Sequence, residues 1–281
     1  YEESKPVVFS SIFPVTTEDY DSLSAAMERL KLNDAGLVYE KVSSTGLGFG
    51  FRCGFLGLLH LEVVQERLER EFDLGLVLTA PTVLCRVTLS DGSVLFIDNP
   101  LLYPDPSQIV MTEEPYIKAS IIMPDKYIGP VTNLLLDRRA ENYSNNYVGR
   151  MRVEIRAELP LSEVVYDFYD KLKSITQGYG SFDYEPGDYR KSDLVKVDIL
   201  VNHEKVDALS MLVHRDRAPG WARRACENLK EEIPRQQFKI PIQGAIGGTI
   251  IARSTISALR KDVTAKCYGG DITRKRKLLA K

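Results

Sequence analysis

The side chains best suited to chemistry lie at the end of the chain, where lysine and arginine gather. From Arg253 onward the sequence has nine Lys or Arg residues and two acids, Asp262 and Asp271, so this segment carries about +7. The whole chain has a formal net charge of -2, and the preceding part is therefore acidic. A cationic segment on an acidic body attracts phosphate groups and limits unspecific adhesion. The pattern indicates a polyanionic partner, and a tail that merely keeps the terminus solvated is the simpler alternative.

The order of residues within this segment favours RNA over other polyanions. Gly269 and Gly270 permit positive φ angles, which lets Asp271 and Thr273 cap a short helix over residues 272–281. Tyr268 offers a ring that can stack on a base, and each arginine offers a planar fork for two phosphate oxygens. We predict the following RNA-binding set: Arg253, Arg260, Lys261, Lys266, Tyr268, Arg274, Lys275, Arg276 and Lys277.

Fragments of catalytic motifs occur elsewhere, but none has complete spacing. The glycines of residues 46–50 resemble a phosphate loop without the lysine and hydroxyl residue that such a loop needs. Residues 214–216 spell HRD without the other kinase motifs, and residues 203–204 begin a zinc motif that lacks its second histidine. We therefore expect no catalytic residue, no metal site and no cofactor in this chain. A carboxylate pair among the 39 acidic residues is left open.

Arg52 and Cys53 on a glycine-rich stretch, with His60 on the adjoining element, allow an enzymatic interpretation. Cys53 and His60 could act as nucleophile and base, although ordinary packing is the simpler interpretation of one Cys and one His on adjoining elements. Arg52 could hold a phosphate in an acylphosphatase-like hydrolase, and a structural ion pair is an equal alternative. The hydrolase site that would use Arg52 lacks a clear nucleophile or base.

Length and composition indicate a globular protein of about two domains, with three small domains as an alternative. The 281 residues are 44% hydrophobic, and the four cysteines lie far apart without a CxxC pair. Reduced thiols are therefore expected, and no apolar run is long enough for a membrane span. Because the chain opens on Tyr1 and stops within a basic stretch, we expect it to be a piece of a longer protein.

Residues 1–97 have the pattern of one βαββαβ unit. Strands are predicted at 7–13, 36–42, 46–55 and 79–89, and a turn at Asp91 and Gly92 leads into a further strand. The first helix is predicted to be capped by Thr17. Both helices carry apolar residues at helical spacing, namely Leu23, Ala26, Met27 and Leu30 in the first and Leu61, Val64, Leu68 and Phe72 in the second.

The same order returns after a proline-rich segment, residues 98–112, which we interpret as a linker. Residues 113–190 repeat the βαββαβ order, with a helix that Ser162 is predicted to cap. Residues 191–281 form a third unit of strands around one helix and match no common fold. The predicted class is α+β, with two ferredoxin-like sandwiches followed by a separate α+β domain that carries the basic tail.

Several long stretches resemble the C-terminal half of the LepA family, the ribosomal back-translocases also called elongation factor 4. The similarity spans essentially the whole chain and is most specific in the glycine-cysteine stretch and in the CYGGD run with its basic continuation. The stretches that carry it are GFGFRCGFLGLLHLEVVQERLEREFDL (48–74), HRD (214–216), IPRQQF (233–238), IIARST (250–255), LRKDV (259–263) and AKCYGGDITRKRKLL (265–279).

The resemblance implies a division into a domain III-like unit (1–97), a domain V-like unit (113–190) and a LepA-type C-terminal domain (191–281). It implies a monomer that binds ribosomal RNA, ribosomal proteins and tRNA, with Arg52 as a further candidate for a ribosome contact. No P-loop or NKxD motif is present, so the GTPase domain with its GTP and Mg²⁺ would belong to a missing N-terminal part. The resemblance implies a cytoplasmic, ribosome-associated protein, and it leaves open a peripheral place at the membrane or an organelle stroma or matrix.

Two other kinds of function stay open at this point. One is the stand-alone phosphate-ester or acylphosphate hydrolase that would use Arg52. The other is a structural interaction module whose basic tail binds an acidic protein. The dependence of binding on salt separates RNA binding from both, because each phosphate contact adds about 0.7 to 0.9 to the slope of log affinity against log salt.

Overall fold

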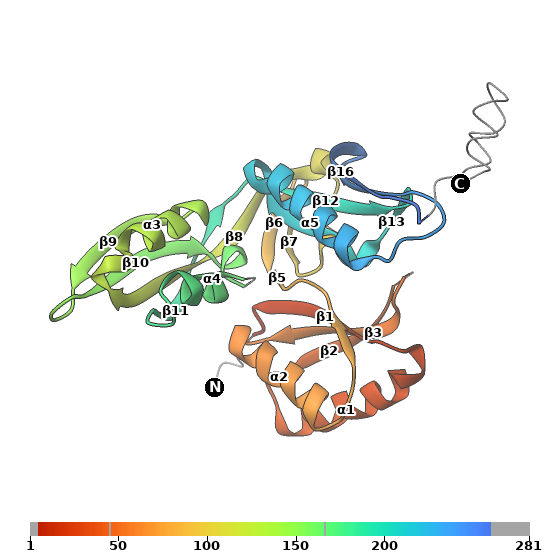
Figure 1. The fold of residues 1–281 in the computed structure, drawn as a ribbon, viewed down its shortest axis with the longest axis horizontal. Coiled ribbons are helices and arrows are strands. Elements are labelled where there is room, and N and C mark those ends of the chain that lie inside the picture. The colour runs from red at the N-terminus through yellow and green to blue at the C-terminus, as the bar shows by residue number, and fades with distance from the viewer. Residues whose placement is uncertain (1–4, 45, 166, 260–281) are drawn as a thin grey trace, which may run out of the picture. The chain divides into compact units, whose positions relative to one another are not determined.

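The fold is α+β, as predicted, with three antiparallel sheets and five α-helices in the described residues (Figure 1). The computed structural model describes residues 5–44, 46–165 and 167–259. Two compact units divide the chain: the first runs to Lys196 and includes Asp207–Arg215, and the second comprises Val197–Val206 and the residues from Asp216.

The first sheet has the strand order β2–β3–β1–β4, which is the order of a ferredoxin-like sandwich. Both helices bury the apolar residues that the sequence predicted, except that Phe72 is only partly buried. The elements are β1 (Val8–Pro14), α1 (Tyr20–Asn33), β2 (Val38–Ser44), β3 (Gly48–Phe55), α2 (Leu58–Arg70), β4 (Leu76–Leu78) and β5 (Thr82–Val83).

Gly50 explains why β3 is rich in glycine. A Cβ atom at this position would lie 2.4 Å from the carbonyl oxygen of Ile12 and 2.5 Å from the ring of Phe13, both on the neighbouring strand β1. Only glycine permits this approach. Gly50 therefore serves strand packing, whereas an added Cβ at Gly46 would meet nothing within 4 Å.

The second sheet repeats the same order and adds two strands. Its strands run β7–β6–β8–β10–β9, and β11 pairs with β8, so β9–β10–β8–β11 corresponds to β2–β3–β1–β4. The predicted repeat is thus confirmed. The elements are β6 (Cys85–Leu89), β7 (Val94–Ile97), β8 (Ile109–Pro124), α3 (Ile128–Asp137), β9 (Glu141–Tyr147), β10 (Arg152–Pro160), α4 (Phe168–Ile175) and β11 (Ser181–Lys191).

The predicted strand at 79–89 is divided between the two sheets, contrary to the prediction of one closing strand. Thr82–Val83 pairs with β1, whereas Cys85–Leu89 pairs with β7 and β8. Cys85 and Val87 are buried there, so the alternating apolar residues belong to the second core. The segment interpreted as a linker contains two 3-10 turns, Pro100–Leu102 and Pro106–Gln108, and the beginning of β8.

Two predicted helix caps are wrong for the same reason: a short 3-10 turn precedes each helix. Thr17 lies in the turn Thr17–Asp19, so α1 begins only at Tyr20. Ser162 lies in the turn Leu161–Glu163, and α4 begins at Phe168. The Ser162 hydroxyl donates to the carboxylate of Glu114 at 3.4 Å instead of capping a helix.

The third sheet has the order β13–β12–β15–β16, and β14 also pairs with β12. A Cβ atom at Gly244 would lie 2.8 Å from that of Ala222, so glycine on β15 lets the helix α5 approach the sheet closely. Gly247 and Gly248 turn the chain with positive φ angles. The elements are β12 (Leu194–Val201), β13 (Glu204–Lys205), β14 (Met211–His214), α5 (Ala218–Glu232), β15 (Ile240–Ile246) and β16 (Thr249–Ile256).

Candidate nucleic-acid interface

Two of the predicted site residues, Arg253 and Arg52, are described by the structure. The remaining predicted residues lie outside the described part of the chain: Arg260, Lys261, Lys266, Tyr268, Arg274, Lys275, Arg276 and Lys277. The candidate interface is therefore built here from the residues that precede them.

Arg253 lies on β16, where its side chain is exposed. It pairs with Gln243, and the adjacent pair of Gly244 and Ala252 lies on the sheet face that α5 covers. Because side chains alternate along a strand, Arg253 points to the other face. No ion pair within the described ranges engages it, so its charge is available to a partner.

An exposed loop lies beside the point where the described chain ends. The backbone N–H of Leu259 donates to the carbonyl oxygen of Gln236 at 2.8 Å. Arg235, Phe238 and Lys239 belong to this loop, residues 234–239, in which every residue is exposed. Phe238 is 57% exposed. An uncovered aromatic ring between two cations is typical of RNA-binding surfaces, where rings stack on bases and cations contact phosphates.

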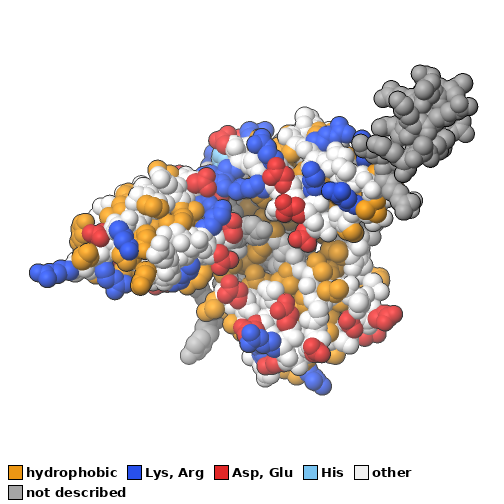
Figure 2. All heavy atoms as spheres, in the orientation of Figure 1, with side chains coloured by type: hydrophobic (Ala, Val, Ile, Leu, Met, Phe, Trp, Pro, Cys, Tyr) orange, Lys and Arg blue, Asp and Glu red, His pale blue; other side chains and the backbone are white. Residues whose placement is uncertain are grey.

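The helix α5 contributes further charge to the second unit. Between residues 216 and 259 the chain has seven Lys or Arg residues and four Asp or Glu residues. Arg223, Arg224 and Lys230 are exposed on α5. Figure 2 shows Lys and Arg side chains over α5, with Asp and Glu side chains among them. Residues 216–259 thus have a moderate surplus of positive charge.

Sequence reasoning missed Arg235, Phe238 and Lys239. The signal was present, because the stretch PRQQFK places one aromatic residue between two cations. Their position beside Leu259 could not be predicted, since it depends on a hydrogen bond between residues 23 positions apart, Gln236 and Leu259.

Arg52 is an interior group, and its surroundings support the structural alternative. Its side chain is 6% exposed. One guanidinium nitrogen donates to the Ser11 hydroxyl at 3.2 Å, and the other donates to the Thr82 hydroxyl at 2.7 Å and to the carbonyl oxygen of Asp98. Burial lowers the pKa of Arg52, and the coulombic effect of Asp98 opposes this. The guanidinium is thus held by neutral oxygens inside the fold, where it offers no open face to a phosphate.

Cys53 and His60 do not form a nucleophile–base pair. Burial raises the pKa of the Cys53 thiol to about 12, and its Sγ lies 3.8 Å from the carbonyl oxygen of Phe51. The imidazole of His60 accepts from the N–H of Leu56 at Nδ1 (2.9 Å) and donates from Nε2 to Asp34 at 2.5 Å. Both side chains are thereby engaged in packing and loop fixation, as the simpler interpretation predicted.

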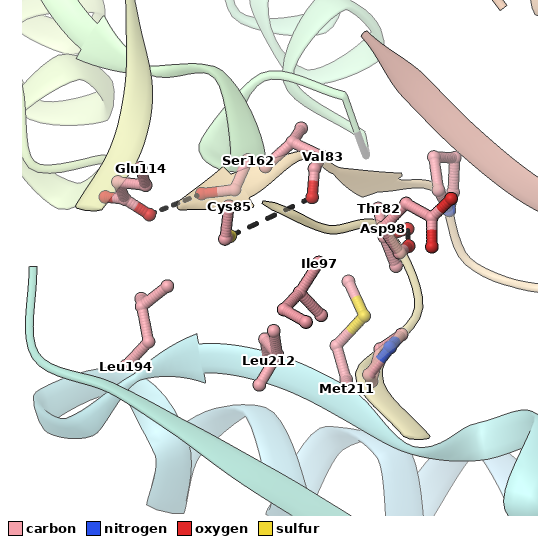
Figure 3. Close-up of a pocket in the computed structure, with 12 residues that line it drawn as sticks. Thr82, Val83, Cys85, Ile97, Asp98, Glu114, Ser162, Leu194, Met211 and Leu212 are labelled. Atoms are coloured by element: carbon pink, nitrogen blue, oxygen red, sulfur yellow. Dashed lines mark hydrogen bonds between the residues drawn. The ribbon is translucent and has the colours of Figure 1, made fainter. Parts of the chain in front are cut away.

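A small enclosed pocket in the first unit also lacks catalytic groups (Figure 3). Its volume of about 20 Å³ is enough for a single water molecule. Cys85 projects into it with a thiol whose pKa burial raises to about 12. Glu114 at its edge is neutralised by Arg139 at 2.8 Å and accepts from the Ser192 hydroxyl at 2.9 Å. The pocket is therefore a packing defect near a structural ion pair.

The described residues also bear on metal binding and on membrane insertion. Among the residues that the structure describes, no group of three or more His, Cys, Asp or Glu side chains is placed to bind a metal ion. None of the helices described is long and apolar enough to cross a membrane.

Comparison with known families agrees with this architecture. Residues 4–80 match the family model "Elongation Factor G, domain III", and residues 111–200 match "Elongation factor G C-terminus". Residues 201–281 match "GTP-binding protein LepA C-terminus". Two domains of the elongation factor G type, followed by a LepA-type domain, define the architecture of a translation elongation factor.

Individual relatives narrow this class. Elongation factor 4 of Desulfosudis oleivorans is 67% identical over all 281 residues, and that of Syntrophobacter fumaroxidans is 64% identical. The same protein of Desulfotalea psychrophila is 65% identical. The chain belongs to the elongation factor 4, or LepA, family, as the resemblance predicted. It spans 47% of the length of each of these relatives.

Proposed function

We propose that this chain is the ribosome-binding portion of a translational GTPase and that its second unit contacts RNA. The observation that supports the RNA contact most directly is the loop 234–239, which presents Phe238 between two cations and is bonded through Gln236 to Leu259. Arg260 and Lys261, the next members of the predicted set, follow Leu259 directly in the sequence.

In this proposal the chain acts by binding and positioning, without covalent chemistry. The two sandwiches brace on ribosomal RNA and proteins. The C-terminal domain, residues 191–281, contacts tRNA on elongating or stalled ribosomes, in back-translocation or in the maintenance of fidelity. GTP and Mg²⁺ bind the remaining half of the longer protein, which is a cytoplasmic, ribosome-associated monomer with GTPase activity.

Sedimentation of the chain with ribosomes over a range of salt concentrations tests this proposal. The double variant Arg235→Gln/Lys239→Gln should reduce the slope of log affinity against log salt by about 1.4 to 1.8, because two phosphate contacts are lost. Replacing Arg274, Lys275, Arg276 and Lys277 with glutamine should reduce the slope by about 3.

A matched control removes the same charge from another surface. Arg29 and Lys41 are exposed in the first sandwich. No RNA contact is proposed for either residue, so the variant Arg29→Gln/Lys41→Gln should leave the slope unchanged. Equal effects of the control and the loop variant would show that only net charge matters. Salt dependence unchanged in both the loop and the tail variants would contradict the RNA-binding proposal. A GTPase assay on the chain should show no turnover, and GTP turnover would mean that these residues hold a nucleotide site of their own.

A further inference from the structure

The strand β9, in the second sandwich, is exposed on both faces. All of its residues from Glu141 to Tyr147 are exposed, and the exposure continues through residue 152. Its partner β10 alternates normally, with Val153 and Ile155 buried. β9 is the last strand of its sheet and, with β10, forms a hairpin that extends from the sandwich (Figure 1). A strand that contributes so little to the core indicates a role at the surface.

The tip of this hairpin presents apolar groups to solvent on a defined backbone. Tyr147 is 67% exposed and Met151 is 72% exposed. Met151 has a φ of 62°, in the left-handed region that a side chain with a Cβ disfavours. Its carbonyl oxygen accepts from the N–H of Asp125 at 2.9 Å, and the N–H of Val148 donates to the carbonyl oxygen of Arg152 at 2.9 Å. Gly149 also has a positive φ, of 77°, so these residues form the turn of the hairpin and fix the direction of the side chains at its tip.

The charges of the hairpin differ from those of the sheet beside it. Arg150 and Arg152 are its cations, and no acid occurs from residue 142 to residue 153. In the part of the chain that the structure describes, no ion pair engages either of them. By contrast, Arg190 pairs with Glu141 at 2.8 Å and with Glu158 at 2.5 Å. Figure 2 shows Lys and Arg side chains at the end of this hairpin.

We propose that the hairpin, residues 142–152, is a second RNA-binding surface that takes an unpaired segment of RNA, such as a loop or bulge. Tyr147 and Met151 contact the faces of exposed bases, and Arg150 and Arg152 contact phosphates. The strand also carries three asparagines and one serine, whose side chains combine donors and acceptors for base edges. Unpaired RNA fits better than duplex, because only unstacked bases offer their faces to a tyrosine ring.

The alternative partner, a protein, is less well supported. A protein interface needs a buried apolar centre with depleted charge, whereas this tip combines two unpaired arginines with asparagine-rich neighbours. The proposal rests on the proposed binding of the second sandwich to ribosomal RNA, but it concerns a surface outside the second unit and does not depend on the tail. The tail can therefore bind RNA when the hairpin does not, and the hairpin can bind RNA when the tail does not.

Binding of the whole chain to two RNA probes tests the stacking contact. The probes are a stem with an adenosine loop and a duplex of equal length. Tyr147→Ala should weaken binding to the loop probe at least about fivefold, in the range of a lost base–aromatic stack. Tyr179→Ala is the matched control, because Tyr179 is 65% exposed on the same sandwich. Equal affinities of the two variants for the loop probe would overturn the proposal.

The salt dependence of binding tests the proposed phosphate contacts of Arg150 and Arg152. Arg150→Gln/Arg152→Gln should reduce the salt slope for the loop probe by about 1.4, because single-stranded contacts each contribute about 0.7. The control Arg29→Gln/Lys41→Gln should leave it unchanged. Both variants are expected to unfold at the same urea concentration as the unmodified chain, since residues 150 and 152 are exposed. An unchanged slope in a folded Arg150/Arg152 variant would overturn the phosphate assignment.

Photo-crosslinking identifies the class of partner. Benzoylphenylalanine at position 147 should crosslink to ribosomal RNA in the complex with ribosomes. Crosslinks to ribosomal protein alone would overturn the proposal and identify a protein-docking surface. The tail variant distinguishes the two proposals: if it abolishes ribosome binding while every hairpin variant binds normally, the hairpin proposal fails and the proposed function remains.

Discussion

Replacing Arg52 distinguishes a structural arginine from a ribosome contact. Arg52→Ala removes three hydrogen bonds, to Ser11, Thr82 and Asp98, and leaves a cavity in the fold. A hydrogen bond that involves a charged group contributes about 1.5 to 3 kcal/mol. The three are not additive, because the Thr82 hydroxyl keeps its own bond to Asp98 at 2.7 Å. We expect Arg52→Ala to lower the free energy of unfolding by about 3 kcal/mol.

Arg52→Met is the informative companion. Methionine retains much of the side-chain volume and removes the desolvation of the guanidinium, so we expect a loss of about 1 kcal/mol. Urea unfolding followed by circular dichroism measures both variants. Ribosome sedimentation on the folded Arg52→Met variant should give an unchanged salt slope. A slope reduced by about 0.8, with stability unaffected, would refute the reasoning and identify Arg52 as a phosphate contact.

Two further predictions concern packing and pH. Gly50→Ala should destabilise the chain by about 2 kcal/mol or more, because its Cβ would overlap the carbonyl oxygen of Ile12. Gly129→Ala in α3 is the control and should stabilise by up to about 1 kcal/mol, since nothing lies within 4 Å of the added atom. Urea midpoints measure both, and equal midpoints would contradict the packing argument. The pKa values of Cys53 and Cys85 are raised to about 12 in the folded chain from an ordinary 9.0. Because the folded state then binds more protons than the unfolded state, stability is full below pH 9 and falls as the pH rises towards 12. Cys53→Ala/Cys85→Ala should flatten this alkaline decline in urea titrations, and a decline that persists unchanged would contradict the assignment.

Much of the fold could be predicted because its signals are local. Helical spacing identified the buried residues of α1, and the repeated element order identified two sandwiches of one topology. The errors occur where local signals compete. Thr17 is a suitable cap by residue type, but a 3-10 turn separates it from the helix. The run at 79–89 alternates like one strand, yet its two halves join different sheets, and only long-range pairing decides which.

The candidate sites were predictable to different degrees. The basic tail is conspicuous because its charges are consecutive in the sequence. The loop 234–239 is not conspicuous, since Phe238 looks like an ordinary apolar residue until its exposure is known. The strand β9 is polar throughout and lacks the alternation by which strands are recognised. The proposed role of Tyr147 follows from its 67% exposure, whereas the Tyr143 hydroxyl is hydrogen-bonded to that of Thr132 on α3.

The environments of the arginines explain how a chain with a net charge of -2 has the exposed cations that the RNA-binding proposals require. Arg52 is enclosed by neutral oxygens and Arg190 is neutralised by three carboxylates, so neither contributes to an external field. Arg150 and Arg253 are exposed and outside the ion pairs of the described residues. Phosphate binding depends on such local charges more than on the total, because charges farther than about 8 Å are largely screened at physiological salt. In the two proposals, the acidic remainder of the chain limits unspecific binding, and the loop 234–239 and the hairpin 142–152 determine where RNA binds.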